Sequence, residues 1–295
     1  MSLIQFTVDA VASKLKSFGF TGFYQLNNGF NLNRYTPMEY SIYTCVPLAL
    51  LFVLFRYGFQ RLFGNLISAN NNPILRLKFS ESLYKLLYYA LTFYTICNIL
   101  IYEEHIYPDI KKCWVNLLEG QPRSLAVSSY YIFELSYYIS ELLCMSWLET
   151  KRKDHIVLYT HHLVTITLLG LSYASGFHKI GILVLYSHNI NDIFLEAAKV
   201  CKYMGLEVLA NINFAFLIIS WILSRLYFLP FYVVRSAIYD TEEILFNNPE
   251  YTISYYVANG CLITLCAMHV YWFFLICRIA INALRNGTPE DERED

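Results

Sequence analysis

Long apolar stretches, separated by short polar connections, recur along most of the chain. About seven of them are long enough for a helix to cross the hydrocarbon core of a bilayer, which takes about 20 residues. They cover residues 40–63, 82–102, 126–148, 156–173, 179–199, 208–234 and 255–281. The pattern therefore predicts an all-α polytopic membrane protein with about seven transmembrane helices.

The connections divide the chain into four predicted regions. Residues 1–36 carry apolar side chains at helical spacing, which suits either a helix in the membrane interface or one that packs on the protein. Residues 37–80 would hold the first span and a cytosolic loop, and residues 81–282 the six remaining spans. Residues 283–295 are polar and acidic, which predicts a disordered cytosolic tail.

The composition supports a membrane location. Of the 295 residues, 56% are hydrophobic and 15% are charged, and the mean hydropathy is +0.38. The formal net charge of -1 gives no electrostatic basis for a nucleic-acid partner. The eight cysteines form no CxxC pair and no metal-type spacing, so neither a metal site nor a disulfide framework is expected.

Basic residues gather in alternate connections, and this asymmetry predicts an orientation. Cytosolic loops carry an excess of Lys and Arg, whereas the connection at residues 240–250 is acidic. The N-terminus is then expected on the lumenal side and the C-terminus in the cytosol. The basic connections are marked by Arg61, Arg76, Lys78, Lys151, Arg152, Lys153, Lys199, Lys202, Arg278 and Arg285.

Ionisable side chains interrupt several predicted spans. Each costs on the order of 2.5 to 3.5 kcal/mol at the bilayer centre, so such groups usually face a cavity or a partner. The fifth span carries His188, Asp192, Glu196 and Lys199 at spacings of four, four and three, which makes one polar stripe along a helix. Because this stripe cannot face lipid, the second to seventh spans are expected to enclose a polar-lined lipid chamber.

Two adjacent histidines, His161 and His162, lie in the fourth span. Neighbouring residues on a helix point about 100° apart, so the two imidazoles are expected to have different tasks. A single buried histidine is usually a satisfied core residue. A pair followed by His188 in the next span indicates chemistry, and Asp192 beside His188 would stabilise a cationic imidazole.

Other polar residues in the spans leave two interpretations open. Glu134 and Glu141 lie two turns apart on nearly one face of the third span. They could face the chamber, or they could pair with Arg225 or with tyrosine hydroxyls and only fasten helices together. Lys85 is expected to extend to the membrane interface, and Pro230 to kink the sixth span.

Several motifs follow one another in a fixed order. They are KRKD at residues 151–154, HH at 161–162, SY at 172–173, H-x3-D-x2-LE-x2-K-x3-Y at 188–203, FELSYY at 133–138, RLYFLPF at 225–231 and HVYWFFLI at 269–276. Together they resemble the signature of the ceramide synthases within the TLC-domain family, over about residues 80–282. One departure is Asn189, where many ceramide synthases have Asp, because an amide cannot act as a base.

The resemblance implies a TLC-type catalytic membrane domain at residues 81–282, located in the endoplasmic reticulum membrane. Such a domain transfers an acyl group from fatty acyl-CoA to the amine of a sphingoid base and releases ceramide and CoA. Acyl-CoA is then a co-substrate, and no cofactor is expected. The expected partners are fatty acyl-CoA, a sphingoid base and membrane lipids, and a homo- or heterodimer is compatible with the family.

The resemblance also implies roles for individual residues. His161 is expected to react, either as a general base or as a nucleophile that accepts the acyl group. His162, His188 and Asp192 would orient it and stabilise charge. The expected substrate-binding residues are Lys151, Arg152, Lys153, Asn189, Glu196, Glu134, Arg225 and Trp272.

Three other classes of membrane protein share some of these features. A non-catalytic TLC-domain protein for lipid sensing or translocation would keep the spans but would not need the polar stripe together with the KRKD turn. A seven-helix receptor has no need of paired histidines facing His188 and Asp192. An elongase or desaturase requires HxxHH boxes, and no histidine stands three residues before His161.

Overall fold

The computed structural model of the chain describes residues 38–66, 72–104, 109–117, 121, 123–147, 153–246 and 252–286. Three predictions therefore fall wholly or partly outside the described residues: the interfacial segment at 1–36, the roles of Lys151 and Arg152, and the tail beyond residue 286.

Helices account for all regular secondary structure in the described residues, which confirms the all-α prediction. The helices in order are α2 (Met38–Phe63), η2 (Gly64–Leu66), α3 (Pro73–Asn98), η3 (Ile99–Glu104), η4 (Ile110–Trp114), α4 (Leu125–Trp147), α5 (His155–Ser175), α6 (His178–Tyr203), α7 (Glu207–Ser220), η5 (Trp221–Val234), α8 (Arg235–Phe246) and α9 (Thr252–Asn286).

Five helical segments among the described residues are long and apolar enough to cross a membrane, in agreement with a multi-pass protein. They are Tyr43–Phe63, Pro73–Ile101, His155–Ser175, Glu207–Glu242 and Thr252–Arg285. The predicted spans at 126–148 and 179–199 form α4 and α6 but are not among the five. Their hydropathy is lowered by inward-facing polar residues, such as Glu134 on α4 and Asp192 on α6.

Local signals in the sequence fix several helix ends. The side chain of Asn72 caps α3, because its Oδ1 accepts from the backbone N–H groups of Ile74 (3.1 Å) and Leu75 (3.2 Å). Pro73 occupies the first helical position, where a missing N–H costs nothing. Gly176 adopts a left-handed conformation (φ 80°) between α5 and α6. At the other end of the chain, α9 continues past residue 282 to Asn286, so the start of the expected disordered tail is helical.

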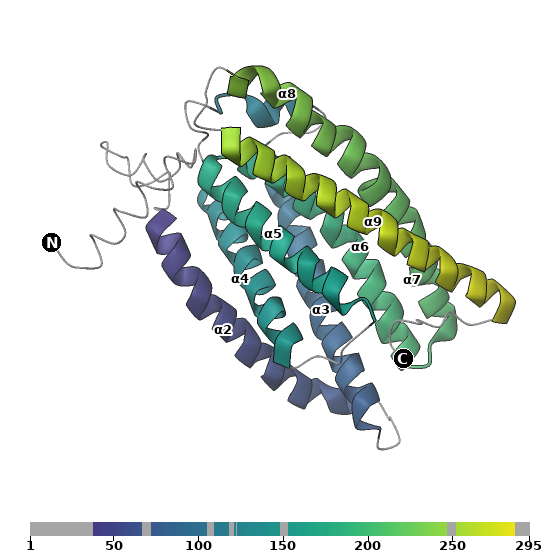
Figure 1. Ribbon diagram of the computed structural model, residues 1–295. Helices are drawn as coiled ribbons and strands as arrows, with labels where there is room; N and C mark the ends of the chain where they lie inside the picture. Colours follow the sequence, from purple (N-terminus) through teal and green to yellow (C-terminus); the bar gives the residue numbers. More distant parts are fainter. Residues whose placement is uncertain are drawn as a thin grey trace.

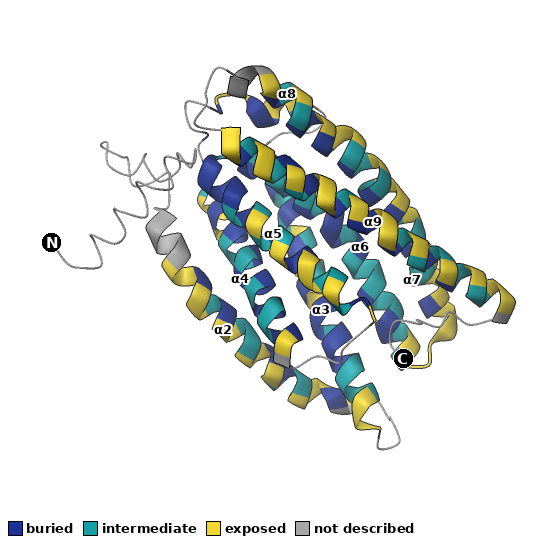
Figure 2. Cartoon of the chain, in the orientation of Figure 1, coloured by how far each residue is buried: buried dark blue, intermediate teal, exposed yellow. Residues whose placement is uncertain are grey.

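The helices form an elongated bundle in which α6 lies inside (Figure 1). α6 packs on α3, α5 and α7, while α2 packs on α4 at one side of the bundle and α9 runs along α5 and η5. α8 and η4 meet at one end, where Trp114 Nε1 donates to Ser236 Oγ at 2.9 Å. Buried residues face the interior and exposed ones lie on the outer sides of α2 and α9 (Figure 2).

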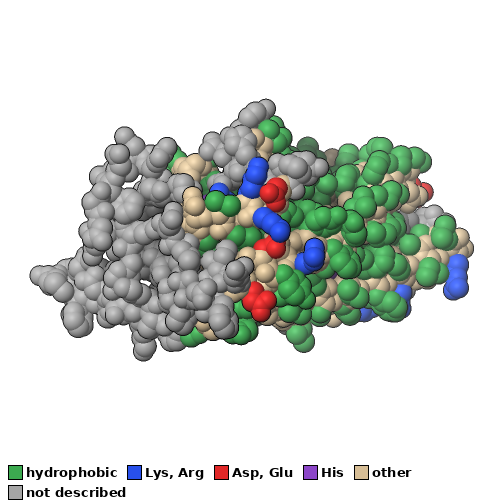
Figure 3. All heavy atoms as spheres, turned by 90° about the horizontal axis from the view of Figure 1, so that it is seen from above, with side chains coloured by type: hydrophobic (Ala, Val, Ile, Leu, Met, Phe, Trp, Pro, Cys, Tyr) green, Lys and Arg blue, Asp and Glu red, His purple; other side chains and the backbone are tan. Residues whose placement is uncertain are grey.

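The outer surface is apolar, as expected for helices in contact with lipid. Leu54 and Leu62 on α2 are 69% and 75% exposed, and Phe274 on α9 is 62% exposed. Figure 3 shows one face of the molecule, on which hydrophobic side chains cover a broad area while Lys, Arg, Asp and Glu are confined to a narrow zone and the far end. Such a surface would be unusual on a protein in water.

The segment that contains Pro230 differs from an ordinary α-helix. From Trp221 to Val234 the chain forms a π-helix, and the Arg235 N–H donates to the Pro230 carbonyl five residues back. Pro230 has no N–H and therefore removes one backbone hydrogen bond from the helix. The sequence predicted a kink at this residue, and the structure shows a change of helix type over the whole segment. π-Helical turns are frequent at functional sites, and this one carries Arg225.

Candidate active site

Two neighbouring cavities lie inside the bundle. One is polar and is lined from α3, α4, α5, α6, η5 and α9, whereas the other is largely apolar and extends to α8 and η4. Tyr138 lines both cavities, so they adjoin at this residue. Apart from Tyr89 and Tyr138, the ionisable residues that line the polar cavity are Lys85, Glu141, Asp154, His161, His162, Asp192, Glu196, Lys199 and Arg225.

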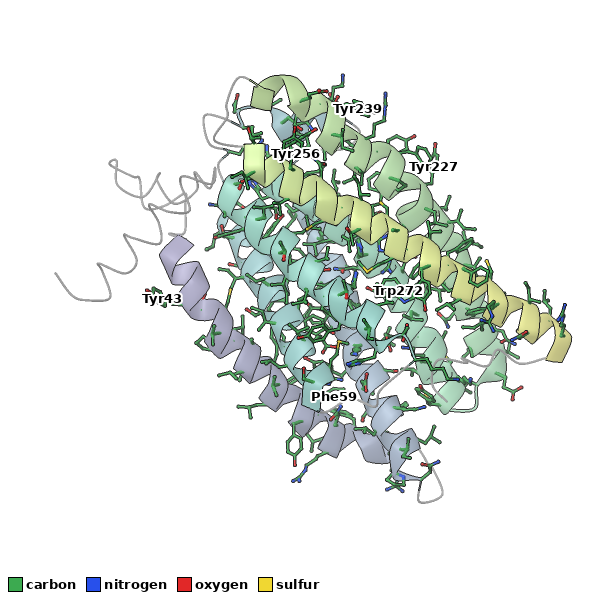
Figure 4. The ribbon with its side chains drawn as sticks, in the orientation of Figure 1. Tyr43, Phe59, Tyr227, Tyr239, Tyr256 and Trp272 are labelled. Atoms are coloured by element: carbon green, nitrogen blue, oxygen red, sulfur yellow. The ribbon has the colours of Figure 1, made fainter. Side chains whose placement is uncertain are left out.

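Three histidines, here called the histidine cluster, lie where the two cavities approach each other: His161, His188 and His269. The ring centroid of His161 is 6.0 Å from that of His188 and 6.4 Å from that of His269. Trp272 stands edge-on to His161 at 5.3 Å. Figure 4 shows Trp272 on the inner side of α9, whereas Tyr43 points away from the bundle. His161 lines the polar cavity and His188 the apolar one.

The hydrogen bonds of His188 determine which of its nitrogens carries a proton. Its Nδ1 lies 2.7 Å from the carbonyl oxygen of Val184, and a carbonyl can only accept, so Nδ1 must donate. In a neutral imidazole Nε2 then accepts. Its partner is His269 Nε2 at 3.1 Å, which must therefore be the donor. Arg225 also donates to the backbone oxygen of His188 at 3.1 Å, so the residue is held from three directions.

His161 is much less constrained. Its ring receives no hydrogen bond from the described residues, and its buried Nδ1 has no partner there. The sequence predicted that His162, His188 and Asp192 would orient it, but the structure shows ring contacts with the two histidines and no hydrogen bond to any of the three. An imidazole with unused nitrogens beside a cavity can take up a proton or an acyl group.

His162 lines the same polar cavity as His161 and also packs on Tyr138, with 5.6 Å between the ring centroids. The two adjacent histidines therefore reach the same space from different directions, as the geometry of a helix requires. Their different tasks remain a prediction.

Asp192 is fixed by the π-helix. Arg225 Nη2 donates to Asp192 Oδ1 at 2.7 Å, and the guanidinium stacks on Trp221 with 4.2 Å between Cζ and the ring centroid. The sequence offered Arg225 as a partner for Glu134 or Glu141, and the structure shows it paired with Asp192 instead. Asp192 lines the polar cavity with His161, so its negative charge is available to that space but balanced by Arg225.

Glu134 and Asn189 lie behind the cavity wall. Glu134 is fully buried, accepts from Tyr88 Oη at 3.0 Å and from Asn189 Nδ2 at 3.3 Å, and lines neither cavity. Asn189 Nδ2 also lies 3.2 Å from Tyr130 Oη and 3.1 Å from Thr92 Oγ1. Of the interpretations that the sequence left open, pairing with a tyrosine hydroxyl is therefore the one found at Glu134. This position favours a supporting role over direct contact with a substrate.

Glu141 has a different environment from Glu134. It lines the polar cavity, where its Oε1 pairs with Arg56 at 2.7 Å and its Oε2 with Lys85 at 3.0 Å. The prediction that Lys85 extends to the membrane interface is wrong. Its side chain is 10% exposed and turns inward, because two buried carboxylates, those of Glu81 and Glu141, are within 3.0 Å.

The remaining predicted binding residues mark one end of the polar cavity. Lys153 is exposed and directly precedes Asp154, whose Oδ2 accepts from Trp272 Nε1 at 3.1 Å. Glu196 pairs with Lys199 at 3.0 Å near the end of α6. This end of the cavity therefore adjoins two of the basic connections that the sequence assigned to the cytosol.

Sequence reasoning overlooked several residues of this site. His269 was given no role and entered only as the first residue of the HVYWFFLI motif, and Arg56 was not considered. Lys85 was assigned to the membrane interface, and Asp154 entered only as part of the KRKD motif. The only signal for His269 was an ionisable residue in an apolar span, within HVYWFFLI. Arg56 also lies inside an apolar stretch, and the same argument would have identified it.

The chain is similar to known proteins over most of its length. The TLC domain family matches residues 78–278. Ceramide synthase LOH2 of Arabidopsis thaliana is 36% identical over 255 residues, which cover 82% of this chain and 86% of that protein. Ceramide synthase 5 of Homo sapiens is 34% identical over 226 residues, 76% of this chain and 56% of that protein. Ceramide synthase hyl-2 of Caenorhabditis elegans is 27% identical over 284 residues, 90% and 85% of the two chains.

Proposed function

Because this chain belongs to the TLC-domain family and is similar to ceramide synthases over most of its length, we propose that it is itself a ceramide synthase. It transfers a fatty acyl group from acyl-CoA to the amine of a sphingoid base. The amine nitrogen bonds to the thioester carbonyl carbon, the carbon–sulfur bond breaks, and the CoA thiolate receives the proton that the amine loses. The products are a ceramide and free CoA, and acyl-CoA acts as a co-substrate with no further cofactor.

One observation carries the proposal: His188 lines the apolar cavity and His161 the polar one, and their ring centroids are 6.0 Å apart. An acyl chain suits the apolar cavity and a charged head group suits the polar one. The thioester carbonyl would then lie between them, beside His161. Acyl transfer to an amine needs a group that takes a proton or the acyl group at this place, and an imidazole can do either.

Two roles for His161 fit this arrangement. As a general base it takes the proton from the attacking amine. As a nucleophile its ring nitrogen bonds to the carbonyl carbon and releases CoA, after which the amine displaces the imidazole. The second route requires that water be kept away from the acyl-imidazole, and the burial of His161 and His162 supports this. Asp192 and Arg225 line the same space and would stabilise charge that develops there.

The proposed location is the endoplasmic reticulum membrane, with the N-terminus lumenal and the C-terminus cytosolic. We also propose that α4 and α6 cross the membrane with the five apolar segments, so that seven spans result and the last six enclose the lipid chamber. The polar end near Lys153 and Lys199 would face the cytosol, where the basic connections at residues 151–153 and 199–202 meet anionic CoA. Membrane lipids surround the chain, and a homo- or heterodimer is compatible with the family.

The test uses membranes from cells that lack their own ceramide synthases and express this chain. Membranes receive a fatty acyl-CoA and a sphingoid base, and the amide product is measured by mass spectrometry. We expect ceramide only when both substrates are present, and none from a His161→Ala variant that reaches the membrane in equal amount. A wild-type chain that is present in the membrane but forms no amide with acyl-CoAs of any chain length would contradict the proposal and favour a lipid-binding role.

A further inference from the structure

A group of four buried charges joins the first helix to the wall of the polar cavity. Arg56 on α2 lies between two carboxylates, with Nη1 2.7 Å from Glu141 Oε1 and Nη2 3.5 Å from Glu81 Oε1. Lys85 lies between the same two carboxylates, 3.0 Å from each. The side chains are 1% to 10% exposed. We call these four residues the charge cluster.

The cluster faces the polar cavity on one side only. Lys85 and Glu141 line the cavity, whereas Arg56 and Glu81 stand behind them. Arg56 also belongs to a helix outside the matched TLC domain, which begins at residue 78. Because α2 packs on α4, a residue outside the family domain pairs with a carboxylate on the wall of the candidate active site.

The balance of charges shows what Arg56 contributes. Glu141 pairs with two cations, Arg56 and Lys85, so the loss of Arg56 would leave it with the Lys85 ammonium only. The cavity itself has an acidic excess among its described lining residues. They include four carboxylates against three cations: Glu141, Asp154, Asp192 and Glu196 against Lys85, Lys199 and Arg225. An uncompensated buried carboxylate here would repel an anionic ligand and attract a cationic one, and the effect is large because the surroundings are of low dielectric.

We propose that Arg56 is a positioning residue for the acyl-CoA side of the reaction. Together with Lys85 it compensates the negative charge of Glu141, so that the wall of the cavity formed by α3 and α4 accepts an anionic head group. This inference rests on the proposed function. It predicts that the two substrates respond differently to the loss of Arg56, because acyl-CoA is anionic and the sphingoid base is a cationic amine.

The experiment compares steady-state kinetics of the wild type with Arg56→Met. We expect the KM for acyl-CoA to rise about tenfold, which corresponds to the loss of about one favourable buried charge interaction. The KM for the sphingoid base should not rise, and kcat should change by less than about threefold. An acyl-pantetheine thioester, which lacks the phosphates of the nucleotide, should show the same KM in both proteins.

Three further variants separate positioning from folding. Arg56→Met combined with Glu81→Gln removes one positive and one negative charge, so the KM for acyl-CoA should return toward the wild-type value. Arg56→Lys keeps the charge and should have an intermediate KM. Arg61→Met changes an exposed arginine on the same helix and should behave like the wild type.

Two results would overturn the inference while leaving the proposed function intact. One is an active Arg56→Met protein with an unchanged KM for acyl-CoA. The other is a uniform loss with both thioesters and both substrates that the double variant does not reverse, since this would show a purely structural role. If Arg56→Met does not accumulate in the membrane, the kinetics of Arg56→Lys and of the double variant decide between the same outcomes. A wild-type chain without ceramide synthesis would instead refute the proposed function.

Discussion

The pairing of His188 with His269 allows a quantitative prediction. In His269→Leu, the hydrogen bond from His188 Nδ1 to the Val184 carbonyl is retained. His188 Nε2 loses its donor, which in the wild type is His269 Nε2 at 3.1 Å. Both rings are buried, with 4% and 0% exposure, so water is not at hand to replace the lost donor. His269→Gln still offers an amide N–H in the same direction and serves as the matched control.

The size of the effect follows from the cost of an unsatisfied buried acceptor. Leaving such a group without a donor costs about 1 to 3 kcal/mol, which corresponds to about 5- to 150-fold in kcat/KM if His188 must keep its position in the transition state. The replacement also removes a ring that contacts His161 at 6.4 Å, which adds to the loss. His269→Gln should lose less than about fivefold, because one hydrogen bond is retained in altered geometry.

The assay is ceramide formation in membranes, normalised to the amount of protein and accompanied by a thermal-stability measurement in detergent. Trp221 Nε1 donates to the backbone oxygen of His269 at 3.2 Å, and that bond survives either substitution, so α9 should stay in place. A His269→Leu protein with kcat/KM within twofold of the wild type would refute the reasoning. Equal losses in the Leu and Gln variants would show that ring packing matters and the hydrogen bond does not.

Three further predictions concern the reacting residue, its surroundings and the orientation. Incubation with acyl-CoA alone should add the mass of one acyl group to the protein, as measured by intact-protein mass spectrometry. His161→Ala should prevent this gain, and a sphingoid base should remove the group. If an active preparation shows no adduct after rapid quenching, His161 acts as a general base. Asp192→Asn, which loses its ion pair with Arg225, should lower acyl transfer by at least about tenfold without loss from the membrane, and full activity would remove Asp192 from the site. The Asn286-Gly287-Thr288 sequon should stay unglycosylated because a cytosolic C-terminus never meets the glycosylation machinery, and a glycosidase-sensitive mass shift there would reverse the orientation.

The sequence by itself determined the class of the protein and most of the candidate reactive residues. Apolar stretches of span length indicate membrane helices wherever they occur, because the bilayer imposes both the length and the hydrogen bonding of the segment. The stripe from His188 to Lys199 had to face inward for the same reason. These are local properties, since each depends only on residues a few turns apart on one helix.

Pairings between helices could not be derived in this way. Lys85 was expected at the membrane interface because the sequence does not show which carboxylate of another helix it would meet, yet Glu141 on α4 lies 3.0 Å from its ammonium group. Likewise, the sequence offered Arg225 two carboxylates, Glu134 and Glu141, but the π-helix directs it to Asp192. His269 became a partner of His188 only through packing of α9, 81 residues further along the chain.

The sequence determines some features and the tertiary structure others for a physical reason. A residue's polarity and its period along a helix are written in the sequence and decide which face must avoid lipid. The pairing of buried charges on different helices depends on how each helix is rotated and how deep it lies in the bundle. Side-chain packing over many contacts sets both. Arg56 illustrates the result: its burial in an apolar helix demanded a partner, and only the tertiary structure decided that this partner was a carboxylate on the wall of the candidate active site.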